Sequence, residues 1–329
     1  MKEKWNIEKP EIVMRAQENH KGMNWILEII VFFAVFIVVG IGQLLIMMPG
    51  EMLLISQNAY YQAAEAAGDL EGMAEALVQI GSSDLYMVLT LFSNIGMILV
   101  VLLFCKLIQK RNPVTLGFRK KGAFKEYLIG LATGFLVFSA AVLICVVTGA
   151  MKIEGISETF GIGMFVLFML GFMIQGMAEE VLCRGYFLVS LGRRNSMWAA
   201  IMLNALAFAA LHLLNDGISV LAFANLVLYG VFISIYFIKR GNIWVAGGFH
   251  SVWNLAQGNI YGILVSGMGT DCTLLKSMSM ENMKIINGGA FGLEGGLAVT
   301  IVLLAGTIFL VFSEASSRQI KEVHRKHHA

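Results

Sequence analysis

The chain has 329 residues, of which 57% are hydrophobic and only 14% are charged, and its formal net charge is +2. A soluble domain carries about 25% charged residues, so the composition excludes an ordinary soluble globular protein. The small net charge itself says little, and nothing in it indicates nucleic acid as a partner.

Apolar residues are gathered into eight blocks, each of roughly the 20 residues that cross a bilayer as a helix. Pro10, Pro49 and Pro113, the three prolines, all lie outside the blocks, so we expect helices without proline. The sequence therefore predicts an all-α fold: a polytopic membrane protein with a bundle of about eight transmembrane helices. The blocks are residues 24–48, 85–107, 127–149, 161–183, 197–215, 218–238, 243–266 and 296–313.

The basic residues predict the orientation of this bundle. With eight spans, 21 of the 24 Lys and Arg residues fall on one side, and Lys152, Lys276 and Lys284 fall on the other. Because basic loops stay in the cytoplasm, both termini are expected there (N-in/C-in). The expected organisation is a cytoplasmic N-terminal tail, one transmembrane helical domain and a cytoplasmic basic tail. These are residues 1–23, 24–313 and 314–329, respectively.

Two outer segments are long. Residues 49–84 contain no Lys or Arg but six acidic residues, and their apolar residues recur at roughly helical spacing. We expect one or two short amphipathic helices there, on the outer surface. Residues 267–295 end in a glycine-rich stretch that indicates turns, and Glu294 is expected near the outer surface of the membrane, where a charge is unremarkable.

Three charged residues end the fourth apolar block: Glu179, Glu180 and Arg184. A charge inside a membrane is costly and usually functional. Glu180 and Arg184 are four residues apart, so they share a helix face and are expected to pair. Glu179 is turned by about 100° from Glu180. We therefore expect the two carboxylates to serve different neighbours, with Glu179 projecting into the bundle without a local partner.

Two histidines lie within apolar blocks, and each has a companion four residues away on the same helix face. His212 follows Phe208, and His250 precedes Asn254. Together with Glu179, these histidines and the amide provide what acid–base chemistry on a carbonyl needs. The sequence has no HExxH metal motif and no GxSxG nucleophile elbow. The predicted chemistry is therefore attack by water without a covalent intermediate.

In order and placement, these three motifs resemble the CAAX protease and bacteriocin-processing (CPBP, or Abi) family of intramembrane proteases. The motifs are Glu179-Glu180-x-x-x-Arg184, Phe208-x-x-x-His212 and His250-x-x-x-Asn254. The resemblance covers a protease core of about residues 160–260. It implies a CAAX-protease-like peptidase of the bacterial plasma membrane. Its expected substrate is a peptide or protein in the bilayer, lipid-modified or not, as in bacteriocin processing.

The resemblance also implies a role for each residue. Glu179 is the general base that activates water, with His212 helping to hold that water, and His250 and Asn254 form the oxyanion hole. Glu180 and Arg184, with Phe208, support the site. The family has been described both as metalloproteases and as metal-free proteases. No cofactor is favoured here; if a metal such as zinc is bound, Glu179, His212 and His250 are its expected ligands.

Two other classes of function stay open. One is a proton-coupled transporter in which Glu179 and the histidines relay protons, although the sequence lacks the repeated halves typical of transporters. The other is a non-catalytic membrane immunity or scaffold protein. Of the other polar residues in the blocks, Gln175 is expected to pack between helices. Gly130-x-x-x-Gly134 is expected to be a close helix contact.

Overall fold

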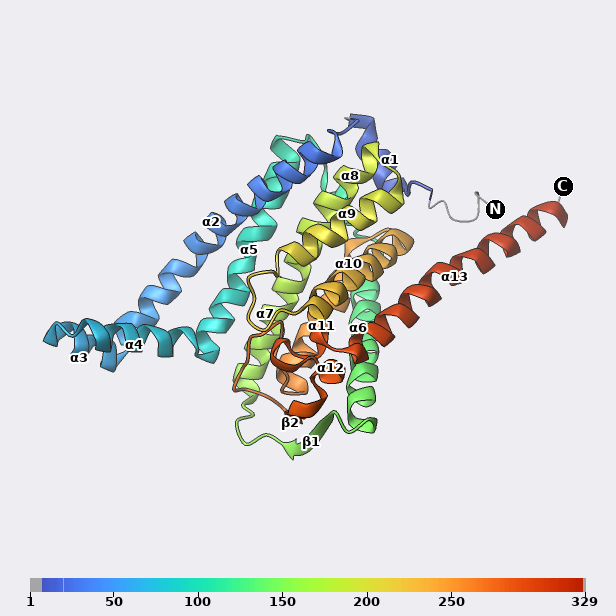
Figure 1. The fold of residues 1–329 in the computed structure, drawn as a ribbon. Helices are drawn as coiled ribbons and strands as arrows, with labels where there is room; N and C mark the ends of the chain where they lie inside the picture. Colours follow the sequence, from blue (N-terminus) through green and yellow to red (C-terminus); the bar gives the residue numbers. More distant parts are fainter. Residues whose placement is uncertain (1–7, 20, 328–329) are drawn as a thin grey trace.

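The computed structural model describes residues 8–19 and 21–327 as a bundle of helices with one small sheet (Figure 1). The predicted tails 1–23 and 314–329 lie partly outside these residues. The helices are α1 (Glu11–Asn19), α2 (Trp25–Gln57), α3 (Ala59–Ala67), α4 (Leu70–Gly81), α5 (Asp84–Leu107), α6 (Ala123–Val147), α7 (Ile162–Glu180), α8 (Val189–Arg194), α9 (Met197–Ala210), α10 (Val220–Arg240), α11 (Ile243–Leu255), α12 (Lys284–Asn287) and α13 (Leu297–His327). The strands are β1 (Met151–Ile156) and β2 (Leu275–Ser279).

Five helices are long and apolar enough to cross a membrane: α2, α5, α6, α10 and the continuous helix Ile162–Arg194 that comprises α7 and α8. The all-α membrane fold is therefore confirmed. The other three predicted spans coincide with α9, α11 and the apolar part of α13. Helix α9 has 14 residues, fewer than the roughly 20 of a full span. Helix α11 has 13 residues and continues into a π-helical segment that ends at Ile260, and neither helix is among the five. The count of eight thus stays a prediction.

Helix α2 is longer than its apolar block, and Pro49 lies inside it rather than beyond its end. The expectation of helices without proline was therefore wrong for this helix. Proline cannot donate a hydrogen bond to the carbonyl four residues earlier, but one missing bond does not end a long helix. After α2, the predicted amphipathic helices of segment 49–84 are present as α3 and α4.

The small sheet was not predicted from the sequence. Strands β1 and β2 pair antiparallel, with Met151 opposite Ser279 and Ile156 opposite Leu275. They join the connection after α6 to the long connection before α13, so the pairing depends on segments far apart in the chain. Figure 1 shows the sheet and α12 at the end of the bundle opposite α1 and α8.

Helices α6 and α11 pack closely because glycines face each other's backbone. A Cβ built on Gly134 would lie 2.6 Å from the Phe249 carbonyl oxygen, and one on Gly130 would meet the Val245 carbonyl oxygen. The predicted close contact at these glycines is confirmed. It anchors α11, which carries His250, in the centre of the bundle.

Replacing these glycines should therefore destabilise the protein. We expect Gly130→Leu and Gly134→Leu each to lower stability by about 1–3 kcal/mol or more, because an added side chain must push α6 away from α11. Thermal unfolding in detergent micelles measures the effect. Gly40→Leu in α2 is the control, since a Cβ there meets no atom within 4 Å. A loss as large for Gly40→Leu would contradict this packing argument.

Candidate active site

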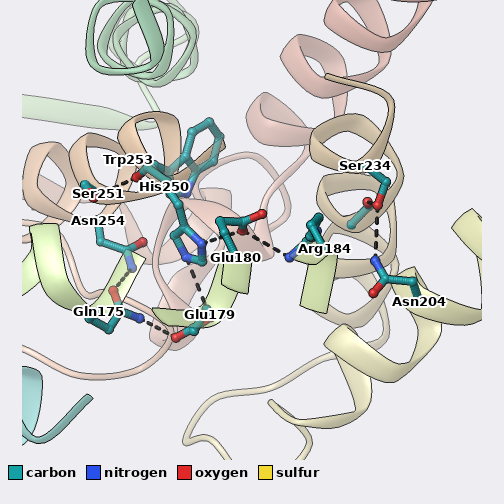
Figure 2. Close-up of polar contacts among 12 residues, drawn as sticks. Gln175, Glu179, Glu180, Arg184, Asn204, Ser234, His250, Ser251, Trp253 and Asn254 are labelled. Atoms are coloured by element: carbon teal, nitrogen blue, oxygen red, sulfur yellow. Dashed lines mark hydrogen bonds and ion pairs between the residues drawn. The ribbon is translucent and has the colours of Figure 1, made fainter. Parts of the chain in front are cut away.

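Residues from α7 and α11 meet in the middle of the bundle and form a connected polar cluster (Figure 2). Asn254 Nδ2 donates to Gln175 Oε1 over 2.9 Å, and Gln175 Nε2 donates in turn to Glu179 Oε1. The second Glu179 oxygen lies 3.8 Å from His250 Nε2. Glu179, His250 and Asn254, which the sequence placed on two helices, thus share one site.

The neighbouring carboxylate, Glu180, lies between a guanidinium and an imidazole. Its Oε1 is 3.0 Å from Arg184 Nη1 and 2.9 Å from His250 Nδ1 (Figure 2). The side chains of Glu180 and Arg184 are both fully buried, and the Arg184 guanidinium also lies 4.6 Å from the centre of the Phe208 ring. The predicted Glu180–Arg184 pair is present, and it fixes one edge of the His250 ring.

Two expectations about the carboxylates were wrong. Glu179 and Glu180 do serve the same neighbour, because they approach opposite nitrogens of the His250 ring. Glu179 also has a local partner in Gln175, one helical turn earlier. Gln175, for which helix packing was expected over a contact with the site, connects Glu179 to Asn254. Its spacing of four residues from Glu179 was the signal that could have identified it.

His212 lies just beyond the end of α9 and faces the same region. Its Nδ1 is 2.9 Å from the Phe208 carbonyl oxygen. Since a carbonyl only accepts, Nδ1 carries a proton, and in the neutral ring Nε2 is then the acceptor. The Phe208 ring packs against both histidines, with ring centres 4.8 Å from His212 and 6.2 Å from His250. Within the described chain, no hydrogen bond joins His212 directly to Glu179.

A cavity of about 250 Å³ unites these groups. Glu179, His212, His250 and Asn254 all line it. Its walls also include polar residues that the sequence analysis did not assign to a site, which come from α2, α5 and the connections after α9, α11 and α12. They are Gln43, Asn94, Asn215, Ser266 and Glu294.

Glu294 is the most unexpected of these wall residues. It is buried inside the protein: its Oε1 accepts from Trp253 Nε1 over 2.9 Å and its Oε2 accepts from Ser266 Oγ over 2.6 Å. Gly292, with φ of +87° and no room for a Cβ beside the Leu264 carbonyl, lets the two connections pack together there. No sequence spacing links residue 294 to α11, so only the folded chain reveals this contact.

The helix that carries both carboxylates changes its geometry directly after Glu180. Residues 181–188 form a π-helical segment, a feature often found at functional sites. Arg111 stabilises it by donating to the Gly185 carbonyl over 2.8 Å and to the Tyr186 carbonyl over 3.2 Å. Burial lowers the pKa of Arg111 to about 10, so the guanidinium stays charged at neutral pH. Arg111 therefore helps to hold Arg184 in place.

Glu179, His212 and His250, the expected metal ligands, are not gathered around one point as a metal ion requires. Glu180 and the Phe208 carbonyl engage Nδ1 of His250 and of His212, so only Nε2 of each ring could serve as a ligand. Among the residues described here, no three His, Cys, Asp or Glu side chains are grouped to hold a metal. No step of the reaction below is therefore assigned to one.

Residues 159–256 match the family model described as type II CAAX prenyl endopeptidase Rce1-like. The matched segment includes all seven residues of the three motifs, and it agrees with the CPBP family that they resemble. Comparisons with curated proteins and with solved structures gave no match. The family match supports, in general terms, a CAAX-protease-like peptidase embedded in the membrane.

The buried ion pair generates a stability prediction. Glu180→Ala should cost about 3–5 kcal/mol of unfolding free energy, because it leaves the Arg184 charge buried without its partner. The double variant Glu180→Met/Arg184→Met should recover most of that loss, since apolar groups of similar size tolerate burial. Thermal unfolding in micelles tests both, with Glu71→Ala at an exposed site on α4 as control. A double variant no more stable than the single one would contradict the argument.

Proposed function

We propose that this chain is an intramembrane endopeptidase that cuts a membrane-associated peptide with water activated by Glu179. The observation that carries the proposal is the connected cluster of Glu179, Gln175, Asn254 and His250 on the wall of one cavity. A carboxylate, an imidazole and an amide directed at the same space are suited to acyl transfer to water.

In the proposed reaction, Glu179 takes a proton from water while the oxygen attacks the scissile carbonyl carbon. His212 accepts the other water hydrogen at Nε2 and so holds the water. Gln175 occupies one Glu179 oxygen, which leaves the second free to act as the base. An amide donor there also keeps the carboxylate in one orientation, which matters because a catalytic base must lie within hydrogen-bonding reach.

The carbonyl oxygen becomes an oxyanion stabilised by two donors. Asn254 gives one amide hydrogen to Gln175 and has the second available. His250, protonated on both nitrogens, donates from Nδ1 to Glu180 and from Nε2 to the oxyanion. When the C–N bond breaks, the proton held by Glu179 passes to the leaving nitrogen, so that the products are one carboxylic acid and one amine.

We further propose that α9, α11 and α13 complete eight spans, with both termini in the cytoplasm of a bacterium. The chain then consists of tail 1–23, the transmembrane domain 24–313 with a protease core of about 160–260, and tail 314–329. The basic residues at the connections next to α8 and α10, against few at the β1–β2 end, support this orientation. The substrate is then a peptide held in the bilayer, with or without a lipid anchor.

Removing the proposed base should abolish proteolysis. We expect Glu179→Gln to lower the rate by about 10²–10⁴-fold, the usual contribution of a general base, while unfolding temperature is kept because the amide fits the same contacts. New protein termini in membranes of cells expressing wild type or Glu179→Gln provide the measurement. Glu71→Gln, at an exposed carboxylate, is the matched control and should behave as wild type.

Termini that appear only with wild type and Glu71→Gln establish the protease and identify its substrate. If all three membranes show identical termini while the wild type still gives a phenotype that Glu179→Gln retains, the chain is a non-catalytic membrane protein. Loss of a proton-coupled flux in Glu179→Gln, without any change in termini, favours the transporter instead.

Single cysteines can test the proposed topology, because all four native cysteines are buried. A membrane-impermeant maleimide added to intact cells should label Glu71→Cys and Asp216→Cys but not Lys121→Cys or Ser196→Cys. The last two should react only after lysis. The pair Ser196 and Asp216 flanks α9, so labelling of both from one side would show that this helix does not cross.

A further inference from the structure

Gln43 of α2 is a polar residue that the proposed mechanism does not use. The buried residues of α2 are Glu28, Phe32, Val35 and Val39, and Gln43 continues the same helix face one turn further. This face ends at the cavity, which Gln43 lines together with Glu179. A polar side chain in a membrane helix usually has a function or a specific partner.

A close crossing of α2 and α5 holds Gln43 in place. A Cβ built on Gly96 would lie 2.8 Å from the Gly42 carbonyl carbon, so the two backbones touch there. Beside this crossing, Gln43 Nε2 donates to Asn94 Oδ1 over 3.0 Å. The glycine contact already brings the helices together, so the amide pair is not needed for that purpose alone.

The hydrogen bonds of the two amides are unequal. Both N–H groups of Asn94 are used: its Nδ2 donates to the carbonyls of Thr90 and Leu91, both over 3.1 Å, and its Oδ1 accepts from Gln43. Gln43 donates only one of its two N–H groups, to Asn94. In the described part of the chain, its Oε1 and its second N–H have no partner, and they belong to a side chain at the cavity wall.

A substrate segment presented for cleavage has unpaired backbone groups that could bond to the free atoms of Gln43. A segment that is extended in the cavity loses its helical hydrogen bonds, and in a membrane each unpaired N–H or C=O is costly. A carboxamide offers one acceptor and one donor side by side, which matches the N–H and C=O of an extended backbone. Asn94 aligns this carboxamide without competing for its free atoms.

We propose that Gln43 is a substrate-binding residue that pairs with the backbone of an extended substrate segment. This inference rests on the proposed function and adds the form of substrate: a stretch unwound next to the scissile bond, recognised through its main chain and not through a particular side chain. Asn94 is the positioning residue for Gln43.

The test measures binding and not turnover, so that it stays separate from the proposed chemistry. The probe is an S-farnesylated CAAX peptide bound to the Glu179→Gln variant in nanodiscs. In a series of peptides, each non-scissile amide near the cleavage site is replaced in turn by an ester, which removes one N–H. We expect one ester to weaken binding by about five- to tenfold, as for the loss of one hydrogen bond.

Adding Gln43→Met, which keeps the size of the side chain, should weaken binding of the all-amide peptide by a similar factor and abolish the effect of that ester. Gln57→Met, the same change at the exposed end of α2, should preserve both. Unfolding temperature is measured in parallel to show that the variants fold.

The assignment is overturned if the ester still weakens binding when Gln43 is replaced by Met. It is also overturned if the proteins with and without Gln43 bind the all-amide peptide equally, or if neither binds it. If binding depends on Gln43 but wild type never cleaves the all-amide peptide, the backbone contact stands and the peptidase proposal fails for this substrate class. The two hypotheses therefore fail in different measurements.

Discussion

The arrangement of the whole site depends on the buried guanidinium of Arg184. An unpaired charge in a low-dielectric interior costs several kcal/mol, so the fold must supply a carboxylate, and Glu180 does so at 3.0 Å. The same Glu180 oxygen contacts His250, so the position of α11 is fixed relative to α7. The Phe208 ring against Arg184 adds a cation–π contact from α9. Three helices are thus held in one arrangement around Glu179.

The π-helical segment after Glu180 carries Arg184. Its i→i+5 hydrogen bonds give a wider turn than a regular helix, which shifts the residues that follow it. Arg111 supplies donors to two carbonyls of this segment from the connection after α5. A second buried cation therefore stabilises the backbone that carries the first. Both charges lie outside the reacting cluster, and their contribution is to fix it in place.

The sequence predicted the parts of the site that are local. Glu180 with Arg184, and Phe208 with His212, are four residues apart, so helical geometry alone brings them together. It missed contacts made by distant segments: Glu294 with Trp253, Gln43 with Asn94, and the β1–β2 pairing. Hydrophobicity located the helices but misjudged Pro49, because composition marks where apolar residues end and not where backbone hydrogen bonds end.

The cavity is lined both by residues inside the segment that matches the family model and by residues outside it. Residues 159–256, which match the family model, carry all seven motif residues, among them the proposed base Glu179. The cavity wall also includes residues of α2, α5 and the connection that carries Glu294, which lie outside the matched segment. The proposed water attack uses none of these residues. Under that proposal they are available for contacts with the substrate, as argued for Gln43.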